Sequence, residues 1–180
     1  MNDSTVVTSA KMISDGFQGM VGKFFCKIHC HLTGCHYFLF SGFCFEVVDF
    51  ESDTVNALGS LETSVTLTTP EDIGKLTAEI VFFEPRFRNE IVYLSGDTVT
   101  YGQVASLLER VLGRPFTRNV WTVPYLMQEL EKDPTHHIKK YRAVFAQGRG
   151  VSWPKAGTFN EQQSIQVTTA EQWARDNLTV

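Results

Sequence analysis

The pattern of apolar and polar positions is most regular from residue 64 onward, where apolar runs alternate with amphipathic ones. Residues 64–68 alternate between apolar and polar side chains, which predicts a strand. Thr69-Pro70-Glu71-Asp72 follows with an N-cap residue, a proline for the first helical position and acids for the first turn. We therefore expect a helix that runs to about Phe83 and ends before Pro85.

The next part of the chain repeats this order of strand and capped helix. Residues 90–94 predict a short buried strand, and Thr100-Tyr101-Gly102-Gln103 matches a capping box. The helix that this box opens is expected to stop at Gly113, because glycine readily adopts the left-handed conformation of a helix end. Residues 116–122 predict another strand.

Helices dominate the remaining sequence. Pro124 starts a helix that bears Leu126, Met127 and Leu130, and a second helix is expected over residues 137–147. Thr169-Ala170-Glu171-Gln172 is a further capping box and opens a C-terminal helix. Strands that alternate with helices predict the α/β class. The strong strands are too few for a complete doubly wound sheet, so a partial sheet is expected.

The first 45 residues follow no such pattern. Residues 1–22 are expected to form a poorly defined segment ahead of a main region over residues 23–180. The stretch from Ile28 to Phe45 has no Lys, Arg, Asp or Glu, but histidines and glycines interrupt it. A helix ending near Gly34 and then a buried strand therefore fit better than a membrane span. The N-terminus lacks the features of a secretory signal, so we expect a cytoplasmic location.

Composition and charge favour one folded domain. Of the 180 residues, 43% are hydrophobic, and 16 basic against 20 acidic side chains give a net charge of -4. Residues 110–155 carry nine of the basic side chains against three acidic ones. This basic segment could face an anion, but charge runs more often form a solvated face. No aromatic residues alternate with the bases, so no nucleic-acid binding is expected.

Two motifs suggest chemistry in the N-terminal region. Cys26, Cys30, Cys35 and Cys44 lie among three histidines, but they lack the tight C-x-x-C pairs of structural zinc sites, so no metal is expected. A metal-binding domain built on these cysteines and histidines stays an alternative. Residues 16–22 have the spaced glycines of a dinucleotide-binding turn, but residues 11–15 separate them from the preceding strand, which favours a flexible turn.

Several segments taken together resemble a known family. Thr69–Lys75, Ile91–Leu94, Val99–Gln103 and Leu108–Arg114 are similar to the C-terminal portion of NmrA-like and isoflavone-reductase-like proteins, which are atypical short-chain dehydrogenases. The likeness extends to Gly34–Phe43 and Thr169–Trp173, and covers about residues 23–180. It implies a partial Rossmann-like fold that keeps C-terminal strands and substrate-binding helices, while the N-terminal nucleotide-binding half is missing or degenerate.

The resemblance also implies a function. It points to the substrate-binding part of an NADP-dependent reductase of an aromatic or related small molecule, with Lys23 as the catalytic lysine and with cofactor contacts at Ser41, Gly42 and Phe43. Phe45, Trp121 and Tyr125 are candidate substrate residues, although core packing is the more common use of such aromatic side chains.

Because the nucleotide-binding half is not recognisable, we expect a truncated chain without turnover. Exposed sheet edges would then favour self-association. The alternative is an NmrA-type regulatory protein that senses a dinucleotide without catalysis, and such members generally lack a catalytic residue at the position of Lys23.

Overall fold

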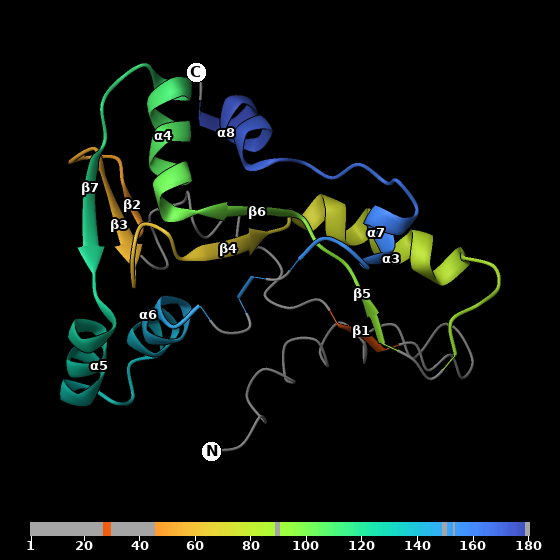
Figure 1. Ribbon diagram of the computed structural model, residues 1–180, viewed down its shortest axis with the longest axis horizontal. Coiled ribbons are helices and arrows are strands. Elements are labelled where there is room, and N and C mark those ends of the chain that lie inside the picture. The colour runs from red at the N-terminus through yellow and green to blue at the C-terminus, as the bar shows by residue number, and fades with distance from the viewer. Residues whose placement is uncertain (1–26, 30–45, 89–90, 149–150, 153, 179–180) are drawn as a thin grey trace.

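The computed structural model describes residues 27–29, 46–88, 91–148, 151–152 and 154–178. Strands and helices mix along these residues, which confirms the α/β class (Figure 1). The strands are β1 (Lys27–His29), β2 (Val48–Asp49), β3 (Thr54–Leu58), β4 (Ser64–Leu67), β5 (Ile91–Tyr93), β6 (Asp97–Thr100) and β7 (Thr117–Trp121). The helices are α3 (Pro70–Phe82), α4 (Tyr101–Leu112), α5 (Val123–Lys132), α6 (His137–Ala146), α7 (Phe159–Gln162) and α8 (Ala170–Leu178).

A three-stranded sheet joins segments that are far apart in the sequence. β3 pairs with β7 in parallel and with β2 antiparallel. The register sets Leu58 opposite Trp121, and the N–H of Gly59 donates to the carbonyl oxygen of Trp121 over 2.8 Å. This pairing fixes Trp121 at the end of the sheet, next to the start of α5.

A two-stranded antiparallel sheet, β4 with β6, leads into two capped helices. The Thr69 hydroxyl accepts a hydrogen bond from the Asp72 N–H over 3.0 Å at the start of α3. Thr100 and Gln103 cap each other at the start of α4, over 2.8 and 3.1 Å. Gly113 ends α4 with a φ of 68°. The predicted caps of α3 and α4 are therefore confirmed.

β5 pairs in parallel with β1. The sequence predicts a helix through Lys27–His29, and that prediction is wrong, because this backbone pairs with β5 instead of closing helical turns. The sequence also predicts a fully buried β5. Val92 is buried, but Ile91 and Tyr93 point to the other face and are 47% and 52% exposed, so β5 is covered on one face.

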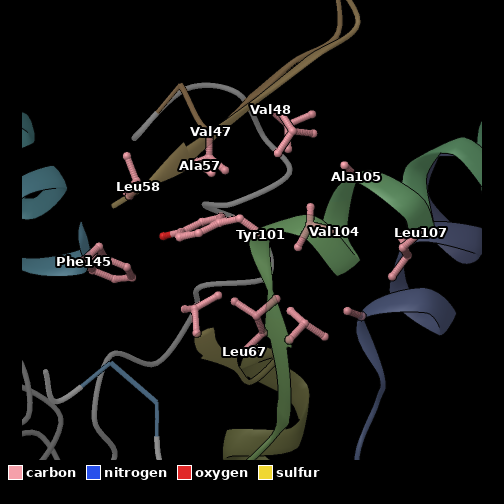
Figure 2. Close-up of a cluster of buried hydrophobic side chains, with 14 of the residues drawn as sticks. Val47, Val48, Ala57, Leu58, Leu67, Tyr101, Val104, Ala105, Leu107 and Phe145 are labelled. Atoms are coloured by element: carbon pink, nitrogen blue, oxygen red, sulfur yellow. The ribbon is translucent and has the colours of Figure 1, made fainter. Parts of the chain in front are cut away.

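Two hydrophobic cores hold these elements together. The larger core surrounds the fully buried Tyr101, at the start of α4, and Figure 2 shows side chains near β2 and β3 above its ring and Phe145 of α6 beside it. The smaller core packs Leu76 and Ile80 of α3 against Val92 beneath them and Phe159 of α7. Each fully buried side chain of this size contributes about 1.5–3 kcal/mol. The cores therefore fix α4 to the sheets and α3 to β5.

Some predicted details differ. In α5 the inward side carries Leu126, and Met127 is 38% exposed. At the start of α8 the Gln172 N–H donates to the Thr169 hydroxyl, but the Gln172 side chain donates to Asp176, so half of the predicted capping box forms. The short elements β2, β3, β6 and α7 are not predicted by the sequence pattern.

Two predictions concern residues that lie largely outside the described ones. The division between residues 1–22 and 23–180 stays a prediction, because the structure describes neither side of that boundary. Among the described residues, no helix is both long enough and apolar enough to cross a membrane. Most of Ile28–Phe45 lies outside them.

Candidate functional site

Two of the predicted site residues, Trp121 and Tyr125, lie on the wall of one hollow. Trp121 ends β7, and Tyr125 lies in the first turn of α5. We call this the aromatic hollow, and its remaining wall consists of Leu126, Glu129, Lys139 and Arg142. Lys23, Ser41, Gly42, Phe43 and Phe45 lie outside the described residues, so their predicted roles stay predictions.

Arg142 of α6 covers the indole ring of Trp121. Its guanidinium carbon lies 4.8 Å from the ring centroid, and one of its nitrogens lies 2.8 Å from a carboxylate oxygen of Glu46. A cation over an indole ring at this distance contributes about 0.5–2 kcal/mol. One face of Trp121 is therefore occupied by the protein's own side chain.

The aromatic hollow is small. Its volume is about 40 Å³, while one water in the liquid takes about 30 Å³ and pockets for drug-sized ligands begin near about 300 Å³. Tyr125 is 47% exposed and forms the outer part of the wall. An aromatic ring is therefore too large for the interior of this hollow, and Tyr125 is the part of the wall that it could contact from outside.

Glu129 sets the electrostatics of the aromatic hollow. The Lys132 ammonium donates a hydrogen bond to it, and the Lys139 Nζ lies 3.7 Å from its second oxygen. The Lys132 hydrogen bond, with smaller effects of the two lysine charges, holds the pKa of Glu129 below its ordinary value. The same hydrogen bond raises the pKa of Lys132. Neither side chain is poised to exchange a proton near neutral pH.

The basic segment found in the sequence is largely neutralised by carboxylates. Arg118 pairs with Glu109 over 2.8 Å, and Arg110 pairs with Glu171 over the same distance. The other basic residues of the segment in ion pairs are Arg114, Lys132, Lys139, Arg142 and Lys155. Neighbouring carboxylates therefore balance most of the positive charge of this segment.

A larger hollow lies at the carboxyl end of β5. Its volume is about 210 Å³, and it lies between Asp97 at the start of β6 and the residues of α7 and of the segment before α8. We call this the polar hollow, and its wall includes Asp97, Lys155, Asn160, Glu161, Ser164 and Gln166. In α/β sheets, ligands bind at the carboxyl ends of parallel strands. Because β5 pairs in parallel with β1, the polar hollow is in the position of a ligand site.

Asn160 of α7 fixes the wall of the polar hollow to the end of β5. The Ser95 N–H donates to Asn160 Oδ1 over 3.0 Å, and Asn160 Nδ2 donates to the Ser95 carbonyl oxygen over 2.9 Å. Both residues are buried. The two bonds satisfy backbone groups that the strand end would otherwise leave unpaired.

Asp97 joins two other parts of the wall. Its Oδ1 lies 3.3 Å from the Lys155 Nζ, and its Oδ2 accepts a hydrogen bond from the Ala170 N–H over 3.0 Å. A carboxylate at a helix N-terminus is favoured by the helix dipole. Asp97 therefore holds both α8 and Lys155 in place. This site is not among those predicted from the sequence, although a polar run directly after a strand was a signal for it.

The start of α3 does not fit the pyrophosphate of a dinucleotide. The pyrophosphate of such a cofactor needs a glycine turn that leaves a strand and opens a helix. β4 leads into α3 through Thr68 and Thr69, and Asp72 already occupies the first turn. That carboxylate would repel a phosphate, so this helix start is closed to one.

The described part of the chain also groups no three His, Cys, Asp or Glu side chains in a way that could hold a metal ion. The four cysteines and the histidines around them lie outside the described residues, apart from the backbone of His29. The metal-binding alternative therefore stays untested.

Comparison with known proteins found one curated relative and several solved structures with a similar fold. No family model matches it. A curated relative, an NmrA-like family domain-containing oxidoreductase from Gibberella moniliformis, is 35% identical over 133 residues. The match covers 73% of this chain and 43% of the relative. The chain therefore spans less than half the length of that protein.

Solved structures share the fold at low sequence identity. An NADPH-dependent quinone oxidoreductase from Escherichia coli superposes with a TM-score of 0.64 at 13% identity, over 96% of this chain and 60% of that one. An isoflavone reductase gives 0.62 at 16% identity, over 83% and 51%. The leucoanthocyanidin reductase–NADPH complex from Vitis vinifera gives 0.57 at 19% identity, over 69% and 46%.

The chain therefore shares the α/β fold of these solved structures. The predicted resemblance to NmrA-like and isoflavone-reductase-like proteins is confirmed by the curated relative and by these neighbours.

Proposed function

We propose that this chain is the substrate-side part of an NAD(P)-dependent reductase that acts on an aromatic or related small molecule. The observation that carries the proposal is the 35% identity to an NmrA-like oxidoreductase over 133 residues. The fold supports it, because neighbours with the same fold include NADPH complexes of reductases.

The aromatic hollow supports a place for the substrate. β7 and α5 bring Trp121 and Tyr125 to one wall although the sequence alone leaves core packing open for both. Tyr125 is 47% exposed, so its ring is available to a ligand in a way that a core tyrosine is not. A ligand ring at the mouth of the aromatic hollow would therefore stack on the exposed ring of Tyr125.

The remaining predicted roles belong to the same proposal. Lys23 would act on the substrate as a general acid, and Ser41, Gly42 and Phe43 would contact NADP, with Phe45 beside the substrate. A lysine acts in this way when desolvation and nearby charge bring its pKa toward neutrality. We further propose that the chain alone holds no NADPH tightly and does not turn over.

Binding of an aromatic probe tests the substrate side. The probe is a water-soluble naphthoquinone, titrated by calorimetry into the full chain and into two matched variants. Tyr125 and Tyr141 are 47% and 45% exposed, but only Tyr125 lines the aromatic hollow among the described tyrosines. Tyr125→Ala should weaken binding about two- to tenfold, the value of an aromatic contact. Tyr141→Ala should leave it unchanged. Equal losses in both variants would contradict the proposed site.

Titration with NADPH tests the cofactor side. We expect no saturable binding in the micromolar range. Should such binding occur, the chain holds the dinucleotide itself, and Lys23→Ala should then abolish reduction of the quinone without changing NADPH affinity. NADPH binding with no reduction of any aromatic probe would instead favour the regulatory alternative.

A further inference from the structure

We infer that the polar hollow binds the hydroxylated part of a neutral small molecule, with Lys155 and Glu161 as the hydrogen-bonding anchors. The inference rests on the proposed function in one respect: it takes this ligand to be a second small molecule of the reductase, separate from the aromatic one at the aromatic hollow. Binding itself is a property of the hollow and is tested without NADPH.

The hollow has walls fixed by the fold. The paired hydrogen bonds between Asn160 and Ser95 tie α7 to the end of β5. On the opposite side the Ile165 N–H donates to the Asn160 carbonyl oxygen over 2.8 Å, and the Thr168 N–H donates to Asp72 Oδ2 over 2.7 Å. The segment between α7 and α8 is therefore anchored at both ends, which keeps the polar side chains of the wall in place.

Charge decides which kind of ligand fits. Asp97 and Glu161 are acidic and Lys155 is basic, so the wall carries a net negative charge near neutral pH. An anion would meet two carboxylates. A cation would face Lys155, and Asp97 is already engaged by Lys155 and the Ala170 N–H. A neutral ligand avoids both costs.

Hydroxyl groups match the hydrogen-bonding groups that remain. An ammonium carries three donors, and the Lys155 ammonium makes one hydrogen bond within the described residues, to Asp97. Glu161 is exposed, and its ionised carboxylate accepts hydrogen bonds but donates none. A hydroxyl group both donates and accepts, so one diol can accept from Lys155 and donate to Glu161.

Size and apolar surface point to a single ring. The volume of about 210 Å³ holds several waters but is below the roughly 300 Å³ of pockets for drug-sized ligands. Ile165 and Val167 line the hollow and pack against the smaller core, so they supply apolar surface for C–H groups. One hydroxylated six-membered ring satisfies both features.

Three six-membered rings that differ in charge test the inference on the full chain: myo-inositol, cyclohexanecarboxylate and cyclohexylamine. Binding is measured by saturation-transfer difference NMR of each probe. We expect myo-inositol to bind most tightly, with a dissociation constant in roughly the millimolar range for so small a ligand. Tighter binding of either charged ring, or no binding of myo-inositol, would overturn the inference.

Two variants locate the binding. Lys155→Met keeps the length of the side chain and removes the ammonium, and Glu161→Gln keeps the shape and removes the charge. Each should weaken myo-inositol binding about tenfold, which corresponds to about 1.4 kcal/mol. Lys140→Met and Glu131→Gln change exposed side chains that do not line the polar hollow and serve as matched controls.

The outcomes separate the two proposals. Glu161 makes no hydrogen bond to another described side chain in its own wall, so Glu161→Gln remains informative if Lys155→Met disturbs α8 through Asp97. Equal binding by Glu161→Gln and Glu131→Gln would remove the assigned anchor and overturn the inference. Naphthoquinone binding that fails while myo-inositol binding persists would overturn the proposed substrate site and leave the polar hollow intact.

Discussion

Replacing Gly96 by alanine tests how tightly β4 lies against the carboxyl end of β5. Gly96 is buried between β5 and β6, at the edge of the polar hollow. A Cβ atom there would lie 1.8 Å from the carbonyl oxygen of Leu67 and 2.7 Å from its carbonyl carbon. These are backbone atoms at the end of β4, so they cannot rotate away as a flexible side chain would. The strand itself must move by well over an ångström.

The loss of stability in Gly96→Ala follows from the buried side chains of β4. Val65 and Leu67 are buried in the larger core, so a shift of β4 disturbs their packing as well as its pairing with β6. Overpacking a core by one methyl group costs about 1–3 kcal/mol and occasionally more. Because the clash is with backbone, we expect about 3 kcal/mol for Gly96→Ala. For a chain of this size that lowers the melting temperature by roughly 6–12 °C.

Gly74 provides the matched control for the same substitution. It lies in α3, is exposed, and has no atom within 4 Å of an added Cβ. Gly74→Ala should therefore stabilise the chain by about 0.8–1 kcal/mol, the difference in helix propensity. Urea unfolding followed by tryptophan fluorescence and circular dichroism measures both variants. An unfolding midpoint of Gly96→Ala equal to that of the parent chain would refute the placement of β4 against Gly96.

Three further substitutions test the caps, the larger core and one ion pair. Thr100→Ala removes the cap that Gln103 reciprocates and should cost about 1 kcal/mol in urea unfolding, whereas loss of no more than a few tenths would contradict the capping box. Leu108→Ala empties a fully buried site and should cost about 2–5 kcal/mol, which thermal unfolding would show as a clear shift. The Arg118 hydrogen bond and then the Phe116 N–H lower the pKa of Glu109 from its ordinary value of 4.5, so the stability from this pair is complete above about pH 4.5 and is lost as the pH falls through the lowered pKa. In Glu109→Gln the urea unfolding midpoint should therefore fall less than in the parent chain as the pH is lowered below about 5. An equal fall in both proteins would show that the pair does not contribute to stability.

The predictions from the sequence included two residues of the aromatic hollow and none of the polar hollow. Trp121 and Tyr125 stood out as aromatic residues near a strand end and a helix start, and the fold brings both to one wall. Nothing in the sequence indicated that Arg142 would cover the indole ring of Trp121, because the two side chains lie on separate elements. The pair of Asp97 and Lys155 was missed for the same reason, since 58 positions separate them.

The sequence by itself determined the starts and ends of the main helices. The Thr69 and Thr100 caps each join residues three positions apart, so their hydrogen bonds depend on local geometry and can be recognised from a short string of residues. Only the tertiary structure decided which strands pair and where hollows open. β3 meets β7 across more than fifty residues, and Lys27–His29 is a strand because β5 supplies its partners. Such contacts depend on the closure of long loops and on packing in the finished core, and short-range sequence patterns carry no record of either.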